Sequence, residues 1–211
     1  MSGNQNQPSI LWLRNDLRLA DNPALTAAAS EGRPLVVVYI HDETSDGIRP
    51  LGAASKWWLH HSLTALDAAL QNLGGQLTLR HGPAARTLPA LVDELDSPAS
   101  DDLANWNLLP TRPDWAEGLR ETWTPGEAGA HDRLTAFVTE RLADYHRRDE
   151  PAVDATSGLS PHLRFGEISP TQIWHRVRGN AAADLPSAAR KNVAKFLSEV
   201  GWHEFSTALL F

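Results

Sequence analysis

Three candidate strands lie in the first part of the chain. Residues 35–40 form a continuous β-branched run, which is typical of a strand buried on both faces of a sheet. Residues 10–13 form a shorter apolar run, and residues 76–80 are the third candidate. The chain is therefore predicted to begin with three strands.

Helical patterns separate and follow these strands. Asn22 followed by Pro23 starts a predicted helix that runs to residue 31, because Asn caps a helix and Pro fits its first turn. Leucines recur at helical spacing over residues 58–73, and a further helix is predicted over residues 84–95. This alternation predicts a Rossmann-like parallel sheet with right-handed crossovers.

The alternation stops at a polar, proline-containing segment, residues 96–102. No fourth or fifth strand is predicted after it, so at least one edge of this small sheet is expected to stay open. We therefore expect an α/β domain over residues 8–95 and a linker over residues 96–125.

The remaining residues, 126–211, show only helical patterns. A long amphipathic helix is predicted over residues 127–148, and the segment 169–172 has the pattern of a capping box that opens another helix. A last helical pattern covers residues 186–211 and ends on apolar side chains, as if a helix were cut in its middle. The expected fold class is α/β followed by all-α.

Composition excludes several classes of protein without selecting a function. The 211 residues are 42% hydrophobic and 21% charged, and no apolar run is long enough to span a membrane. The N-terminus has no signal-peptide pattern, there is no cysteine, and the nine histidines show no metal-ligand spacing. We expect a cytoplasmic monomer without a metal, and the net charge of −7 gives no sign of nucleic-acid binding.

The most informative segment spans residues 144–170, between two helical patterns. It combines an aromatic residue, paired arginines, hydroxyls and glycines, which make poor core material. The hydroxyls of Thr156, Ser157 and Ser160, together with free backbone N–H groups, suit a phosphate group. On the residues alone, a turn and helix-cap cluster is the stronger interpretation.

Residues 144–170 also resemble the flavin-binding segment of the DNA photolyase and cryptochrome family. Residues 12–25, which include Arg14, Asp16 and Arg18, are similar to the N-terminal signature of that family. Further similar segments follow in the family's order, at residues 54–63, 108–130 and 199–205. These matches cover most of the chain, so it is identified as a member of this family.

Two departures from the family pattern matter. After Leu95 the family continues its sheet, whereas this chain passes directly to the linker, so its antenna-type domain is expected to be curtailed. After Phe211 the family continues with most of its helical FAD-binding domain, including the electron-relay tryptophans. The chain therefore resembles a photolyase with an internal deletion and without a C-terminal part, and no catalytic residue is assigned.

The resemblance implies a light-dependent deoxyribodipyrimidine photolyase, a carbon–carbon lyase. In that reaction reduced FAD donates an electron to a cyclobutane pyrimidine dimer in DNA. The implied FAD-binding residues are Tyr145, Thr156, Ser157, Gly158, Leu159, Ser160, Phe196 and Glu199. A second, antenna chromophore of the folate or deazaflavin type is also implied, without assigned residues.

The same resemblance implies contacts to DNA and its lesion by Arg148, Glu199, Trp202 and His203. Trp202 is expected to stack on a flipped dimer, and Glu199 to hydrogen-bond its carbonyl edge. The alternative for Arg148 is an ordinary exposed arginine. For Glu199 and Trp202 the alternative is the buried face of a terminal helix.

Three functional hypotheses stay open. The first is a descendant of a repair photolyase that is impaired or inactive because of the missing segments. The second is a cryptochrome-type blue-light receptor. The third is a non-enzymatic remnant whose sheet domain associates through its open edge.

Overall fold

The computed structural model describes residues 7–179 and 187–210. The chain divides into two compact units, Met1–Glu127 and Ala128–Phe211, and each is described by itself. Residues 1–6, Pro186 and Phe211, about which the sequence made predictions, lie outside the described residues. Within the described residues, no helix combines the length and apolar character needed to cross a membrane.

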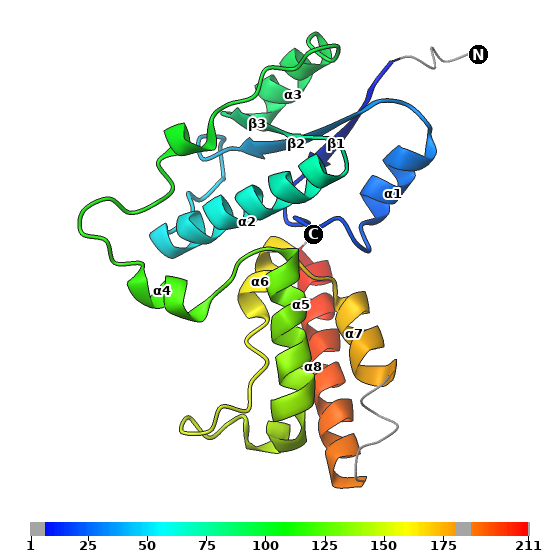
Figure 1. The fold of residues 1–211 in the computed structure, drawn as a ribbon, viewed down its shortest axis with the longest axis vertical. Coiled ribbons are helices and arrows are strands. Elements are labelled where there is room, and N and C mark those ends of the chain that lie inside the picture. Colours follow the sequence, from blue (N-terminus) through cyan, green and yellow to red (C-terminus); the bar gives the residue numbers. More distant parts are fainter. Residues whose placement is uncertain (1–6, 180–186, 211) are drawn as a thin grey trace. The chain divides into compact units, whose positions relative to one another are not determined.

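The first unit contains a parallel sheet of three strands in the order β1-β2-β3, which confirms the predicted fold class (Figure 1). The strands are β1 Ser9–Leu13, β2 Leu35–His41 and β3 Leu77–His81. In the register Leu11 lies opposite Val37, and His41 lies opposite His81. The central position of β2 explains its continuous apolar run, because both of its edges are paired and both of its faces are covered.

Three helices follow the strands: α1 Pro23–Ser30, α2 Ala53–Asn72 and α3 Ala84–Val92. The predicted start of α1 is confirmed, since the Asn22 side chain accepts a hydrogen bond from the Leu25 N–H at 3.0 Å. Leu91 of α3 packs on the face of β2 that carries Val36, Val38 and Ile40. Figure 1 shows α2 on the opposite side of the strands from α3.

The linker after α3 contacts the outer edge of β3. The Ser100 hydroxyl accepts from the Leu79 N–H at 2.9 Å, and the Asp101 N–H donates to the Leu79 carbonyl at 2.8 Å. The 3-10 helix η1 Leu103–Trp106 and the short helix α4 Glu117–Thr122 come next. The linker therefore satisfies part of the polar edge that a strand would otherwise pair.

The second unit is helical, but the helix predicted over residues 127–148 is wrong as a continuous α-helix. Regular helix α5 covers Glu127–Ala136, followed by a π-helical turn η2 Phe137–Arg141 and a 3-10 turn η3 Leu142–Arg147. The Thr139 hydroxyl donates to the Thr135 carbonyl at 2.9 Å, which competes with the regular backbone ladder. The buried Asn192 side chain from α8 donates to the Ala143 carbonyl and so stabilises the altered turn.

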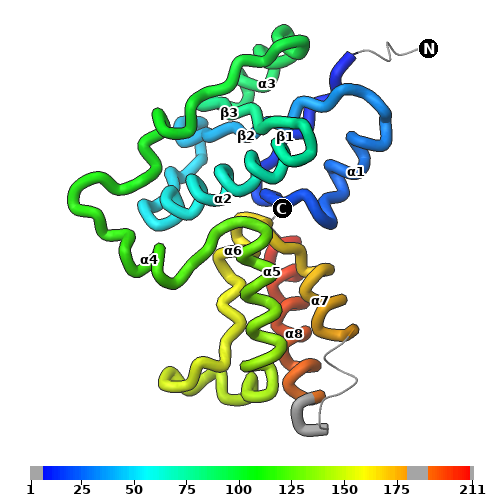
Figure 2. The backbone as a smooth tube through the Cα atoms, viewed as in Figure 1, coloured from blue at the N-terminus to red at the C-terminus, as the bar shows by residue number. Residues whose placement is uncertain are grey.

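Three helices complete this unit: α6 Ser160–Phe165, α7 Pro170–Gly179 and α8 Ser187–Leu210. The predicted capping box is present, since the Gln172 N–H donates to the Ser169 hydroxyl at 3.0 Å and the Ser169 N–H donates to the Gln172 side chain at 2.8 Å. Figure 2 shows the chain leaving α5, turning at the far end of the bundle and running back beside α5 to α6.

The core of the helical unit is largely apolar, and it also encloses a polar pair. Phe137, Leu142 and Ile173 are fully buried. His162 of α6 and Glu167, in the turn before α7, have fully buried side chains, with His162 Nδ1 and Glu167 Oε2 2.5 Å apart. This pair joins the end of α6 to the start of α7, just after the segment predicted to bind the flavin.

Candidate functional site

Tyr145 lies at the centre of an aromatic cluster in the helical unit. Its ring makes edge contacts with Phe137 at 5.8 Å and with Phe196 at 5.3 Å between ring centroids. Phe137 and Phe196 also contact each other at 4.6 Å. All three side chains are buried, so the core role that the sequence allowed for Tyr145 is present in the structure.

Charged side chains flank this aromatic cluster. The Arg148 guanidinium lies 5.2 Å from the Tyr145 ring centroid and 4.0 Å from the Glu199 carboxylate. Glu199 also pairs with Lys195 at 2.6 Å, and the hydrogen bond from Lys195 lowers the pKa of Glu199. Burial raises the pKa of Tyr145, so its hydroxyl remains protonated at neutral pH and can donate to an acceptor.

The segment predicted to bind a phosphate, residues 156–160, is a tight turn. The Ser157 hydroxyl accepts from the Leu159 N–H at 3.3 Å, and Gly158 has a φ of +63°. The Leu159 side chain is buried in the core beside Tyr145, while Thr156 and Ser160 are exposed. A side-chain turn at Ser157 and exposed hydroxyls are both present, whereas Leu159, the N-cap of α6, makes no side-chain capping bond; phosphate binding stays a prediction.

Two arginines that the sequence analysis did not single out lie beside this turn. A Cβ built on Gly158 would come 2.8 Å from an Arg133 guanidinium nitrogen, so that side chain lies directly over the glycine. Burial and, to a smaller extent, the neighbouring charge of Arg141 lower the pKa of Arg133, and Arg141 pairs with Asp154 at 3.4 Å. The two arginines are eight residues apart in one helical segment, a spacing that was visible in the sequence.

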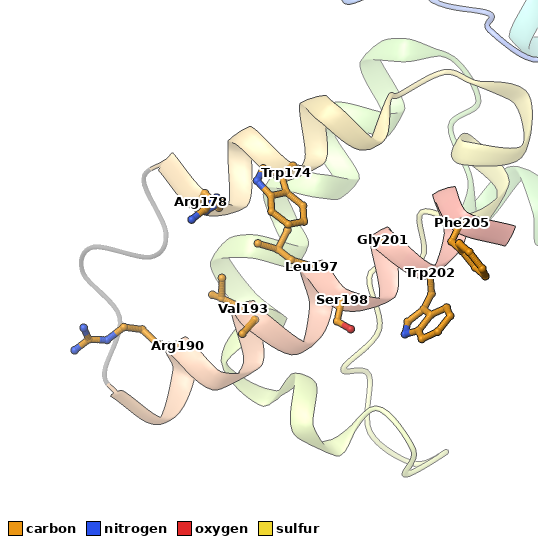
Figure 3. A pocket seen from close by; sticks show the side chains of 10 residues that line it. Trp174, Arg178, Arg190, Val193, Leu197, Ser198, Gly201, Trp202 and Phe205 are labelled. Atoms are coloured by element: carbon orange, nitrogen blue, oxygen red, sulfur yellow. The ribbon is translucent and has the colours of Figure 1, made fainter. Parts of the chain in front are cut away.

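An open groove of about 920 Å³ lies between α7 and α8 (Figure 3). Its apolar lining includes Trp174, Leu197, Trp202 and Phe205, with the Trp202 and Phe205 rings in edge contact at 5.6 Å. Figure 3 shows Arg178 and Arg190 at the other end of the groove from Trp202 and Phe205.

The residues predicted to contact DNA do not form one group. Arg148 and Glu199 lie together beside Tyr145, whereas Trp202 lines the groove and is 59% exposed. His203 is exposed, with its Nδ1 3.4 Å from the Glu204 carboxylate. The Trp202 ring contacts the Phe205 ring, and both side chains are exposed, so the buried helix face that the sequence allowed as the alternative for Trp202 is wrong. Each of these roles in DNA binding stays a prediction.

The carboxyl edge of the sheet carries a second group of titratable side chains, in the first unit. His41 is buried, stacks on Trp106 at 5.2 Å and lies 3.6 Å from Glu43, which pairs with Lys56 at 2.8 Å. Ligands of parallel α/β sheets sit at this edge. Here the Trp106 ring covers the His41 ring. Among the described residues, no group of three acidic or histidine side chains could hold a metal ion.

We expect acidification to lower the free energy of unfolding of the chain through His41, His60 and His61. Burial lowers the pKa of His41, His60 and His61 below the ordinary value of 6.5. The unfolded chain then binds protons that the folded chain does not, so the free energy of unfolding decreases as pH falls below about 6.5. We expect the melting temperature to drop between pH 7.5 and pH 5.5.

The substitution His41→Phe keeps a ring on Trp106 and removes the titrating group. We expect this variant to lose less of its melting temperature over the same pH range. A wild-type melting temperature that stayed constant or rose from pH 7.5 to pH 5.5 would contradict the role of the buried histidines.

The donor set around the turn fits the phosphates of a flavin dinucleotide. Exposed hydroxyls of Thr156 and Ser160 and the guanidinium over Gly158 are groups that bind phosphate oxygens. The buried ring of Tyr145, with a protonated hydroxyl, adds an apolar surface with one polar end. The residues present are therefore compatible with the cofactor that the sequence predicted.

Comparisons with known proteins identify relatives of this chain. The DNA photolyase family model matches residues 9–128. A deoxyribodipyrimidine photo-lyase from Agrobacterium fabrum is 33% identical, over 97% of this chain and 59% of its own length. Cryptochrome-1 from Arabidopsis thaliana is 27% identical, over 96% of this chain and 43% of its own length. Relatives of both kinds are thus similar to this chain.

A solved structure is similar over the whole chain. The crystal structure of a bacterial class III photolyase from Agrobacterium tumefaciens has a TM-score of 0.89 and 33% identity, covering all of this chain and 60% of that one. This chain therefore spans about three fifths of the length of these photolyases. The sequence alignment with the Agrobacterium fabrum protein extends over 290 positions, so that relative has additional residues within the aligned region. By its family model, sequence and fold, the chain belongs to the DNA photolyase family.

Proposed function

We propose that this chain is the part of a photolyase that holds FAD for light-dependent repair of cyclobutane pyrimidine dimers in DNA. The observation that carries the proposal is the packing of Tyr145, Leu159 and Phe196 in one core, with the neighbouring Thr156 and Ser160 left exposed. The similarity to photolyases, with cryptochromes as more distant relatives, supports repair over signalling.

The residues of this chain would bind and orient the cofactor. The hydroxyls of Thr156, Ser157 and Ser160 would bind its phosphates, and Gly158 leaves room for the Arg133 side chain beside them. Tyr145 and Phe196 would support the apolar side of the site, and Glu199 would accept hydrogen bonds from the cofactor. When bound, reduced flavin supplies the electron that splits the dimer.

The exposed side chains of α8, together with Arg148, are the proposed contacts to DNA and its lesion. Trp202 presents a half-exposed ring on which a flipped pyrimidine could stack, while Arg148 and His203 would contact phosphates. Arg148 is already flanked by Asp149 and Glu199, so its share of the binding free energy is expected to be small. We assign no residue to an antenna chromophore, and we propose a monomer that acts in the cytoplasm.

The proposal is tested by adding FAD to the purified chain, removing the excess and recording the flavin absorption band. Retained flavin is then reduced and illuminated with an oligonucleotide that contains one thymine dimer, and repair is read from the recovery of absorbance at 260 nm. We expect retention of the band and light-dependent recovery, both weakened in Tyr145→Ala. The matched control is Tyr39→Ala in the other unit, which should retain the flavin.

The outcomes separate the candidate functions. Flavin retention with photoreduction but no dimer splitting would favour a cryptochrome-type receptor. This alternative is considered because cryptochrome-1 is similar over 96% of the chain. No retained flavin in soluble, folded wild-type protein would refute the proposal and favour a remnant that keeps the fold without the activity.

A further inference from the structure

The sheet of the first unit has two outer edges, at β1 and at β3. The linker hydrogen-bonds to the edge at β3. At β1, the Ser9 N–H donates to the Pro34 carbonyl at 2.9 Å, so the backbone groups of Ser9 point toward β2. Backbone groups alternate in direction along a strand, so the N–H and C=O groups of Ile10 and Trp12 point away from the sheet.

The edge at β1 is open for pairing. In the part of the chain that the structure describes, no backbone group outside the sheet hydrogen-bonds to the outward groups of Ile10 and Trp12. Residues 9–13 contain no charged residue and no proline, and their continuous register with β2 leaves no bulge. Charges, prolines and bulges are the features that usually protect an edge strand from pairing with another strand. The β1 edge therefore keeps the geometry that accepts a further strand.

An apolar groove of about 630 Å³ lies beside this edge. Its lining consists of Ile10 and Trp12 from β1 and of Leu88, Pro89 and Val92 from α3. Val92 is 49% exposed, and Ile10 and Trp12 are half-buried. A strand that paired with β1 would cover these apolar side chains as well, so hydrophobic burial would add to the backbone hydrogen bonds.

The β1 edge is complementary to itself. When β1 meets β1 of a second copy in antiparallel direction, with the two-fold axis at Leu11, Ile10 lies opposite Trp12 of the second copy. Two opposite residues that point their backbone groups at each other exchange both N–H···O=C bonds. Each outward group of Ile10 and Trp12 then has a partner. An aromatic side chain beside a β-branched one is also a favourable cross-strand pair.

We propose that two copies of this chain associate through their β1 edges and form one continuous sheet across a two-fold axis. The same strand and the same groove contribute from each copy, as in other isologous interfaces. A strand of five residues and one groove make a small contact, so the association is weak and depends on protein concentration. The flavin site proposed above lies within one copy, so the monomer is the acting species and the pair forms at higher concentration.

The test is sedimentation equilibrium of the full chain over about 1–200 µM, a range that measures weak association. We expect the average mass to rise with concentration from that of one copy toward that of two. Val92→Glu places like charges on both sides of the axis and should weaken the association at least about tenfold. The matched control is Leu73→Glu, which makes the same charge change at a residue that is 76% exposed and lies outside the groove. It should leave the association unchanged.

A second variant addresses the backbone pairing. Ile10→Pro removes the outward N–H of Ile10 and leaves the hydrogen bonds of Ser9 and Leu11 to β2 in place. It should weaken the association in the same direction as Val92→Glu. Circular dichroism checks that both variants are folded.

Amide hydrogen exchange identifies the paired strand directly. In dilute protein the outward N–H groups of Ile10 and Trp12 should exchange faster than the N–H of Leu11, which faces β2. At high concentration the exchange of Ile10 and Trp12 should slow as the pair becomes populated. Leu11 is the internal control and should change little.

Several results would overturn the inference. One is a chain that sediments as one copy at every concentration, and another is an association that folded Val92→Glu leaves unchanged. Loss of the association in Phe205→Glu instead would place the contact in the groove between α7 and α8. Association without slower exchange at Ile10 and Trp12 would also exclude the strand pairing. Flavin retention is measured in dilute protein, so the inference and the proposed function can fail independently.

Discussion

Replacing His162 by alanine is expected to lower the free energy of unfolding of the helical unit by about 3–5 kcal/mol. The imidazole and the Glu167 carboxylate are both fully buried, with 2.5 Å between their facing atoms. Without the imidazole, the fully buried carboxylate loses this hydrogen-bonding group, and removing one member of a buried polar pair is costly. The variant should therefore loosen the connection between α6 and α7.

The measurement is the urea dependence of hydrogen exchange in peptides from residues 160–179. The control is His175→Ala, an exposed histidine on α7, which should change the free energy of unfolding by less than about 0.5 kcal/mol. Equal effects of the two substitutions would show that the buried pair does not hold these helices together. We further expect Glu167→Gln, which keeps an acceptor for the imidazole, to lower the free energy of unfolding by less than His162→Ala does.

Replacing Phe137 by alanine is expected to lower the free energy of unfolding of the helical unit by about 3–5 kcal/mol. Phe137 is fully buried, and its ring contacts both Tyr145 and Phe196. The cavity left by the ring removes one wall of the aromatic cluster, so Tyr145 and Phe196 lose their fixed orientation. Under the proposed function the variant should also lose flavin at protein concentrations where the wild type retains it.

Phe205→Ala is the matched control for this second prediction. The Phe205 side chain is 54% exposed in the groove between α7 and α8, so its loss should change stability by less than about 1 kcal/mol. Denaturation of both variants is followed by far-ultraviolet circular dichroism. If Phe137→Ala unfolds at the same urea concentration as the wild type, the Phe137 ring does not stabilise the core of the helical unit, and the prediction is wrong.

Local sequence patterns were sufficient to predict those features that depend on interactions between neighbouring residues. The cap at Asn22 and the reciprocal capping box at Ser169 and Gln172 were predicted and are present, because both depend on groups within three residues of each other. The three strands were also predicted, since a buried central strand such as β2 requires a continuous apolar run.

The error over residues 127–148 has a tertiary origin. The apolar spacing there is helical, and it does not reveal that the chain widens into a π turn at Phe137 and tightens into a 3-10 turn at Leu142. Asn192, about fifty residues later, donates to the Ala143 carbonyl and stabilises the altered path. No window of sequence around residue 140 contains that partner.

The sequence by itself determined the α/β and all-α parts, the caps, the family, and the turn 156–160 as the place of candidate chemistry. Only the tertiary structure decided that Arg133 lies over Gly158, that Leu159 enters the core, and that Arg148 and Trp202 belong to different surroundings. The reason is physical: periodicity reports which face of an element is apolar, whereas the partners of a charge depend on which elements pack together.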